Sequence, residues 1–176
     1  MAPRIMVTET DIIFKTPLIV RPITTRFTLH HIGEIPRSLN PYSIDARMIN
    51  GWHLDRGWSG IGYHYVVKRD GVVERGRPRI MMGAHDEGEN ACSIGICVVG
   101  DFTLDIIHPA PLQMISLECL LADLYDIYQK PEAPYIELCG HRDHEPPETP
   151  TECPGDGLYD LIPLISDKVR GLRGTI

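Results

Sequence analysis

Two residues with metal-ligand chemistry share one loop near the C-terminal end of the chain. His141 and Cys153 lie twelve positions apart in the stretch CGHRDHEPPETPTECPG. Imidazole nitrogen and thiolate sulfur are the ligand types that zinc prefers, and prolines stiffen this loop without the support of a helix or a sheet. Two ligands do not make a stable site, so a third ligand has to come from elsewhere in the chain.

The best source of a third ligand is the pair His30 and His31, at the end of the strand-like run RFTLHHI over residues 26–32. Neighbouring residues on a strand point to opposite faces, so only one of the two can share a site with the loop, and the alternation does not say which. Two histidines and one cysteine leave the fourth zinc position for water, which is the open arrangement of a catalytic site. His144 is an alternative to His141 within the same loop.

The other histidines are harder to interpret, because a single histidine is more often a surface residue or a satisfied core residue than a ligand. His85 lies in the glycine-rich loop MGAHDEGEN, where a role in a cleft is favoured over burial in the core. His53 falls in the middle of an expected helix, and its spacing favours a solvated face. Glu152 has the chemistry of a base beside the thiol, although a solvated loop carboxylate is the simpler interpretation.

The order of elements predicts an α/β fold in one domain, with a central mixed sheet flanked by helices. An Asp-Gly pair at 70–71 predicts a hairpin between 62–68 and 72–75, on which Tyr63 shares a face with Tyr65. Further strands are expected at 26–32, 93–99 and 135–138. Helices are expected at 44–55, with Ser43 as the N-cap, at 111–129, and at 158–172 with Pro163 starting or interrupting the last one. Residues 1–25 read as an extended arm with one short edge strand.

The composition of the chain limits which classes of partner are expected. The 176 residues are 43% apolar and 23% charged, with a formal charge of −7 and no basic stripe, so nucleic-acid binding is not expected. No apolar run reaches the roughly 18 residues of a membrane helix, so no stable membrane association is expected. The start of the chain does not read as a secretory signal. Five cysteines, an odd number in no regular framework, favour a reducing compartment.

Five ordered motifs give the chain a family resemblance over about residues 26–170. These are LHH, WHLDRGWSGIGYHYVVKRDG, GRP, GAHDEGENACSIGICVVGDF and GHRD…TECPG. Together they resemble the zinc-dependent N-acetylmuramoyl-L-alanine amidases, in the branch shared by phage endolysins of the lysozyme-amidase type and the peptidoglycan recognition proteins. The resemblance implies a mixed sheet with helices on both sides. It divides the chain into the arm 1–25, part of the same domain, and a catalytic domain over 26–176.

The resemblance also implies roles for individual residues. It selects His30 as the ligand that joins His141 and Cys153 around one Zn²⁺. By the same comparison Tyr63 is a catalytic tyrosine, Thr151 takes a position where active members carry Lys or Thr, and His53 and His85 line a peptide-binding groove. Three departures stand out: Ile32-Gly33 follow the histidine pair where Thr or Ser is usual, EPPETP lengthens the spacing between His141 and Cys153, and Cys92 stands where Asn is common.

The function implied by the resemblance is hydrolysis of the amide between N-acetylmuramic acid and L-alanine of peptidoglycan, by a monomeric phage endolysin that lyses its host. Such an enzyme waits in the host cytoplasm and reaches the cell wall with the help of a holin. One alternative is a recognition module that binds peptidoglycan without cutting it. Such members often lack the ligand cysteine, so Cys153 and Tyr63 argue against it. Another is a cytosolic amidase that recycles released muropeptides.

Overall fold

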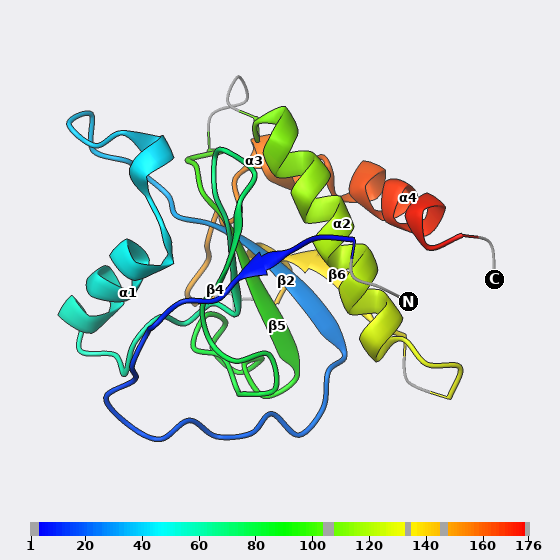
Figure 1. The fold of residues 1–176 in the computed structure, drawn as a ribbon, viewed down its shortest axis with the longest axis horizontal. Coiled ribbons are helices and arrows are strands. Elements are labelled where there is room, and N and C mark those ends of the chain that lie inside the picture. Colours follow the sequence, from blue (N-terminus) through cyan, green and yellow to red (C-terminus); the bar gives the residue numbers. More distant parts are fainter. Residues whose placement is uncertain (1–3, 104–107, 133–134, 145–147, 175–176) are drawn as a thin grey trace.

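A six-stranded sheet forms the centre of the computed structural model, which describes residues 4–103, 108–132, 135–144 and 148–174 (Figure 1). Its strands, in chain order, are β1 (Val7–Thr8), β2 (Arg26–His31), β3 (Tyr65–Val67), β4 (Val73–Arg75), β5 (Ser93–Val98) and β6 (Glu137–Gly140). They lie side by side in the order β1-β4-β3-β5-β2-β6. The hairpin partners β3 and β4 are antiparallel and the other described pairs are parallel, which confirms the mixed sheet.

The helices are α1 (Ala46–Asp55), α2 (Pro111–Tyr128), α3 (Asp156–Tyr159) and α4 (Ile162–Arg173), with 3₁₀ turns η1 (Pro41–Ser43) and η2 (His141–Asp143). Pro163 lies in the first turn of α4, where its missing N–H costs no hydrogen bond. The predicted cap of α1 was wrong. Ser43 lies in η1, and the side chain of Asp45 accepts the hydrogen bond from Met48 N at 2.7 Å.

Two apolar cores cover the two faces of the sheet. Phe27 and Leu29 of β2 and Ile96 of β5 pack with α2 and α4, whereas Val66 and Cys97 face the opposite side and pack with α1. Alternate residues of each strand therefore serve different layers, as the period of two requires. In Figure 1, α2 and α4 cover one face and α1 lies away from them. The fold therefore has three layers, with α1 on one face of the sheet and α2 and α4 on the other.

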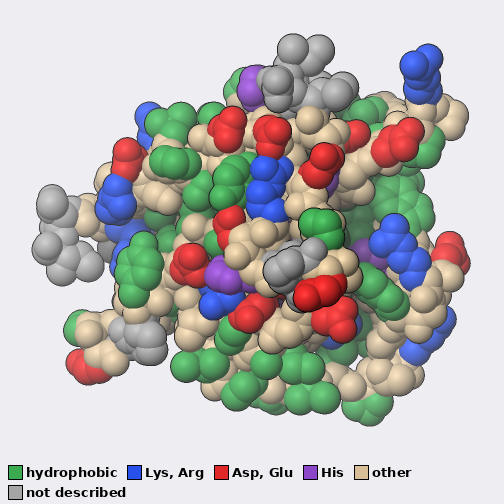
Figure 2. Space-filling model, turned by 180° about the vertical axis from the view of Figure 1, so that it is seen from behind, with side chains coloured by type: hydrophobic (Ala, Val, Ile, Leu, Met, Phe, Trp, Pro, Cys, Tyr) green, Lys and Arg blue, Asp and Glu red, His purple; other side chains and the backbone are tan. Residues whose placement is uncertain are grey.

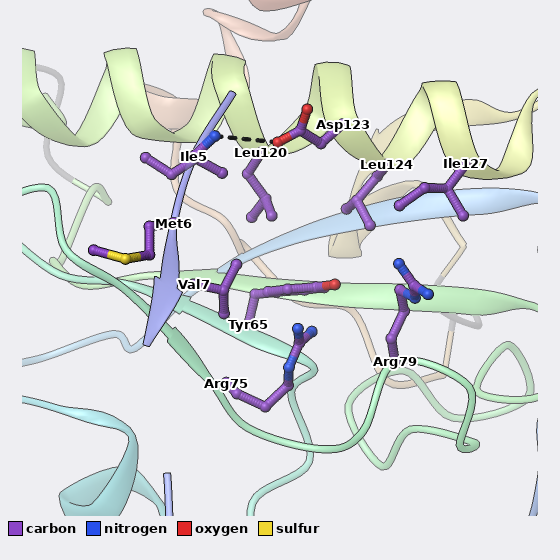
Figure 3. A pocket seen from close by; sticks show the side chains of 10 residues that line it. All are labelled: Ile5, Met6, Val7, Tyr65, Arg75, Arg79, Leu120, Asp123, Leu124 and Ile127. Carbon is purple, nitrogen blue, oxygen red and sulfur yellow. Dashed lines mark hydrogen bonds between the residues drawn. The ribbon is translucent and has the colours of Figure 1, made fainter. Parts of the chain in front are cut away.

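The N-terminal arm adds the short edge strand that the prolines predict. Val7 of β1 pairs with Val73 of β4, and the backbone N–H groups of Arg4 and Ile5 donate to the Asp123 carboxylate on α2. A cavity of about 500 Å³ lies between this arm, the sheet and α2 (Figure 3). Aliphatic side chains of the arm and of α2 make most of its wall, and Arg75 and Arg79 reach it from the side of the sheet.

Candidate metal centre

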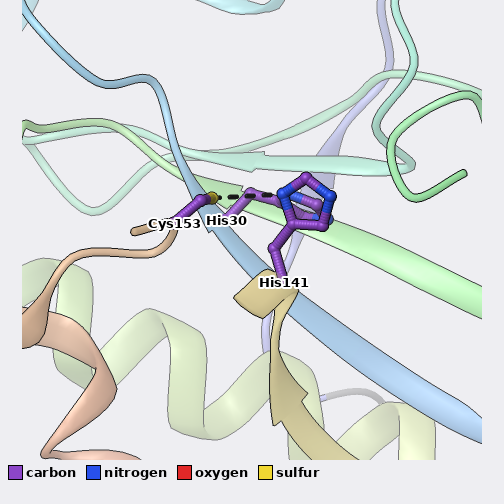
Figure 4. A group of neighbouring side chains, drawn as sticks. All are labelled: His30, His141 and Cys153. Atoms are coloured by element: carbon purple, nitrogen blue, oxygen red, sulfur yellow. Dashed lines mark hydrogen bonds between the residues drawn. The ribbon is translucent and has the colours of Figure 1, made fainter. Parts of the chain in front are cut away.

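Three side chains from distant parts of the chain meet at one point beside the sheet (Figure 4). His30, His141 and Cys153 each offer one ligand atom, and these atoms all lie within 4.8 Å of one another. The Nδ1 atom of His30 is 3.6 Å from Sγ of Cys153, and the imidazole rings of His30 and His141 are 4.5 Å apart. The structure thus brings together the three residues that the sequence analysis singled out as metal ligands. Two imidazoles and a thiol fit a tetrahedral zinc ion that keeps one position open.

The strand β2 decides which member of the histidine pair takes part. His30 points to the face that carries α1 and is 1% exposed. His31 points to the other face, where its Nδ1 accepts a hydrogen bond from Phe102 N at 3.2 Å. Since successive strand residues alternate, the same backbone that buries His30 in the site removes His31 from it.

The other two candidate ligands, His141 and Cys153, are positioned by contacts between the end of β6 and the loop that follows. Arg142 N donates to Cys153 O at 2.9 Å, which ties the turn of His141 to the segment of the thiol. A Cβ on Gly140 would lie 2.8 Å from Cδ of Pro154, so only glycine lets the two segments approach this closely. Thr151 Oγ1 accepts a hydrogen bond from Cys153 N at 3.2 Å. Residues 145–147 of the EPPETP insertion lie outside the described residues.

The structure groups His141, and not His144, with His30 and Cys153. Nε2 of His144 lies 3.2 Å from Glu137 Oε2, and both belong to a separate cluster with Cys139. Glu152, weighed as a base, has an exposed side chain.

Tyr63 lies beside the candidate metal ligands. Its ring is 5.1 Å from that of His30. It precedes β3 and packs with the α1 core, whereas Tyr65 belongs to the core under α2, so the prediction that the two tyrosines share a face was wrong. Burial raises the pKa of Tyr63 well above its usual value, so the phenol keeps its proton and can donate a hydrogen bond.

His53 is buried rather than solvated, with 4% exposure, so the expectation from helix spacing alone was wrong. Its Nδ1 accepts a hydrogen bond from Gly62 N at 2.9 Å, and its ring lies 5.4 Å from Tyr63. Burial lowers the pKa of His53 to about 4, so the ring is neutral at neutral pH. The hydrogen bond with Gly62 forms because the segment before β3 packs against α1. The periodicity of α1 alone does not predict it.

His85 both lines a groove and has a buried ring. It lines a groove of about 360 Å³ together with Trp58, Glu87, Asn90 and His141, which agrees with the expected cleft position. Its ring is nevertheless buried, with 8% exposure, which corrects the expectation that burial is improbable. Nδ1 of His85 lies 3.0 Å from Nε2 of His30. Burial lowers the pKa of both histidines, so both imidazoles are neutral and keep a lone pair.

On the face seen in Figure 2, acidic side chains are interspersed with basic ones, and no continuous basic stripe crosses the described part of that face. Within the described residues, no helix is both long and apolar enough to cross a bilayer.

The fold defines the class of protein to which the chain is similar. It matches the endolysin amidase LysCS from Clostridium intestinale URNW with a TM-score of 0.77 and 30% identity, over 92% of this chain and 95% of that one. It also matches the ectodomain complex of peptidoglycan recognition proteins LCa and LCx bound to tracheal cytotoxin, with a TM-score of 0.72 and 27% identity, over 89% of this chain and 95% of that one. This is the amidase and peptidoglycan recognition protein fold.

Sequence comparison narrows the class to one family. The family profile described as N-acetylmuramoyl-L-alanine amidase matches residues 21–156. The endolysin of Enterobacteria phage T3 is 38% identical over 109 residues, which cover 60% of this chain and 70% of that protein. The chain therefore belongs to the N-acetylmuramoyl-L-alanine amidase family, as its motifs indicate, and is a phage-type hydrolase of that amide bond. Members of this family and fold act on peptidoglycan or bind it.

Proposed function

We propose that the chain is a zinc-dependent amidase that cuts between N-acetylmuramic acid and L-alanine in the host cell wall, with His30, His141 and Cys153 as the zinc ligands. The observation that carries the proposal is the convergence of these three donor atoms within 4.8 Å. Bound there, Zn²⁺ supplies a Lewis acid that polarises the scissile carbonyl and makes water nucleophilic near neutral pH.

The residues around the ligands supply the remaining chemistry. The protonated phenol of Tyr63, close to His30, donates a hydrogen bond to the oxygen on which negative charge develops. Thr151 accepts from Cys153 N and so fixes the backbone that carries the thiol. The groove beside His141 and His85 gives the stem peptide a place to lie against the ligands. The ring of His53 lies 4.5 Å from that of Trp58, which lines this groove, and 5.4 Å from that of Tyr63, so His53 supports both rings.

The biological setting follows from the relatives. The phage T3 protein bears the name endolysin, and we infer the same role for this chain: production in the host cytoplasm, release with the help of a holin, and lysis from within. The enzyme acts as a monomer without stable membrane association, and peptidoglycan is its macromolecular partner.

The proposal is tested with purified peptidoglycan sacculi. The zinc-loaded protein is expected to reduce their turbidity, and mass spectrometry of the products is expected to show stem peptides with a free L-alanine amino terminus. A chelator is expected to stop the reaction and added Zn²⁺ to restore it. Binding to sacculi without cleavage indicates a recognition module instead. Cleavage confined to small soluble muropeptides indicates a recycling amidase.

A further inference from the structure

The imidazole of His85 sits directly behind the ligand His30, on the side away from the thiol. His30 presents Nδ1 to Cys153 Sγ at 3.6 Å, and its Nε2 lies 3.0 Å from Nδ1 of His85. A neutral imidazole carries one proton, on one of its two nitrogens. A metal ligand at Nδ1 therefore requires the proton of His30 to be on Nε2, and His85 Nδ1 then has to accept it.

The other ring nitrogen of His85, Nε2, can donate its proton to the next group in the chain of hydrogen bonds. Its Nε2 lies 3.5 Å from Ser93 Oγ, and Ser93 Oγ donates to the Glu89 carbonyl oxygen at 2.8 Å. Because the hydroxyl proton of Ser93 is already directed to Glu89, Oγ is left to accept a proton from His85 Nε2. The chain of hydrogen bonds thus runs from His30 through His85 and Ser93 to the backbone of Glu89.

The surrounding backbone makes room for this ring. A Cβ on Gly83 or on Gly95 would lie 2.4 Å from Cδ2 of His85. Gly95 occupies the middle of β5, where glycine ordinarily weakens a strand and often marks the close approach of another group. Asn90 Oδ1 accepts hydrogen bonds from the backbone N–H groups of His85 at 2.7 Å and Asp86 at 3.2 Å, which fastens the loop that carries the ring. The two glycines thus leave space for the His85 ring, and the Asn90 side chain fixes its backbone.

From these contacts we infer that His85 is a positioning residue: it holds His30 as the Nε2–H tautomer and so keeps Nδ1 free to bind the metal. The inference rests on the proposed metal site and goes beyond a groove-lining role for His85. Outer partners of this kind change metal affinity by about 10- to 100-fold when they are removed.

The first test compares His85→Leu with His85→Asn, using zinc affinity measured by competition with a chelator. Asn places an oxygen near the position of Nδ1 and is expected to retain most of the wild-type affinity. Leu cannot accept a hydrogen bond and is expected to bind zinc about 10- to 100-fold more weakly. Equal affinity of the wild type and a folded Leu variant overturns the inference. Failure of the wild type to bind zinc sinks the proposed metal site instead, so the two failures are distinguishable.

The second test needs neither a variant nor a metal. Nitrogen-15 NMR of the metal-free wild type reports which nitrogen of each imidazole carries the proton. His30 is expected to be protonated at Nε2 and bare at Nδ1, and His85 is expected to show the same pattern. A His30 protonated at Nδ1 overturns the inference.

Discussion

Nδ1 of His30 lies 3.6 Å from Sγ of Cys153, although 123 positions separate the two residues in the chain. His30 belongs to a strand that is paired on both sides, and Cys153 belongs to a loop after the last strand. The contact therefore exists only in the completed fold. Changes at either end test the proposed zinc site directly.

Replacing the thiol tests its role as a ligand. Cys153→Ser is expected to lose both zinc and amidase activity, because a neutral hydroxyl is a poor substitute for a thiolate. Zinc content of the purified protein and turbidity loss of sacculi are the measurements. Cys119→Ser, a partly buried cysteine on α2, is the matched control and is expected to keep both. An active, zinc-replete Cys153→Ser protein contradicts the ligand assignment.

Removing one hydroxyl tests the role of the tyrosine. Tyr63→Phe is expected to keep zinc and to lose about 100-fold in kcat, or about 3 kcal/mol, the usual cost of one oxyanion donor. Tyr42→Phe alters an exposed ring and is expected to change neither quantity. A Tyr63→Phe enzyme with near-wild-type turnover would show that the phenol takes no part in the chemistry.

A buried histidine should make stability depend on pH. Burial lowers the pKa of His64 to about 3, and its Nδ1 accepts a hydrogen bond from Gly95 N at 3.0 Å. The unfolded chain gains a proton near pH 6.5 and the folded chain does not, so the contribution to stability is complete above pH 6.5 and falls as the pH drops toward 3. Over that window the slope from this one residue approaches about 1.4 kcal/mol per pH unit.

Urea unfolding of wild type and His64→Gln at a series of pH values measures this slope. The variant is expected to be less stable at pH 7, because glutamine cannot reproduce both the bond from Gly95 N and the contact of the ring Nε2 with Met81 O at 2.8 Å. It is also expected to show a shallower decline below pH 6.5. Parallel declines in the two proteins would assign the acid sensitivity to other groups.

Two glycine substitutions separate steric contact from flexibility. Gly140→Ala places a methyl group 2.8 Å from Pro154 Cδ, so it is expected to displace the Cys153 segment and weaken zinc binding. A methyl group at Gly171 in α4 meets nothing within 4 Å, so Gly171→Ala is expected to stabilise the protein by about 0.5–1 kcal/mol without altering zinc affinity. Thermal unfolding and chelator competition on both variants check this. Unchanged zinc affinity in Gly140→Ala would show that the two segments can move apart freely.

The sequence predicted the elements whose signals are local. The Asp70-Gly71 turn, the apolar run of β5 and the long stripe of α2 each identify their element without knowledge of the rest of the chain. The boundaries of β6 were less well predicted: Glu137–Gly140 is observed where 135–138 was expected. Its register is set by pairing with β2, where Arg26 pairs with Glu137 and Leu29 with Gly140. The sequence of β6 alone does not predict that pairing.

For the site, residue types and the family motifs supplied the proposed ligand set, whereas the spatial relations had to come from the fold. Strand alternation alone left His30 and His31 equivalent, and the fold separated them by placing His141 and Cys153 on the face of the sheet to which His30 points. Neither the burial of His53 nor the contact of His85 with His30 has a local signal, because each partner lies in another element. The isolated glycine within the β5 pattern was the one hint that another group approaches closely there.

The pairing of β6 with β2 has a consequence for the edge of the molecule. β6 is a short edge strand that pairs with β2, and the proposed ligands His30 and His141 lie at the end of β2 and just beyond β6. An ion bound to both segments would act as a cross-link at this edge of the sheet, since binding to the native state raises the free energy of opening. Removal of the ion should therefore speed hydrogen exchange in the amides of β6 more than in those of the central strand β5.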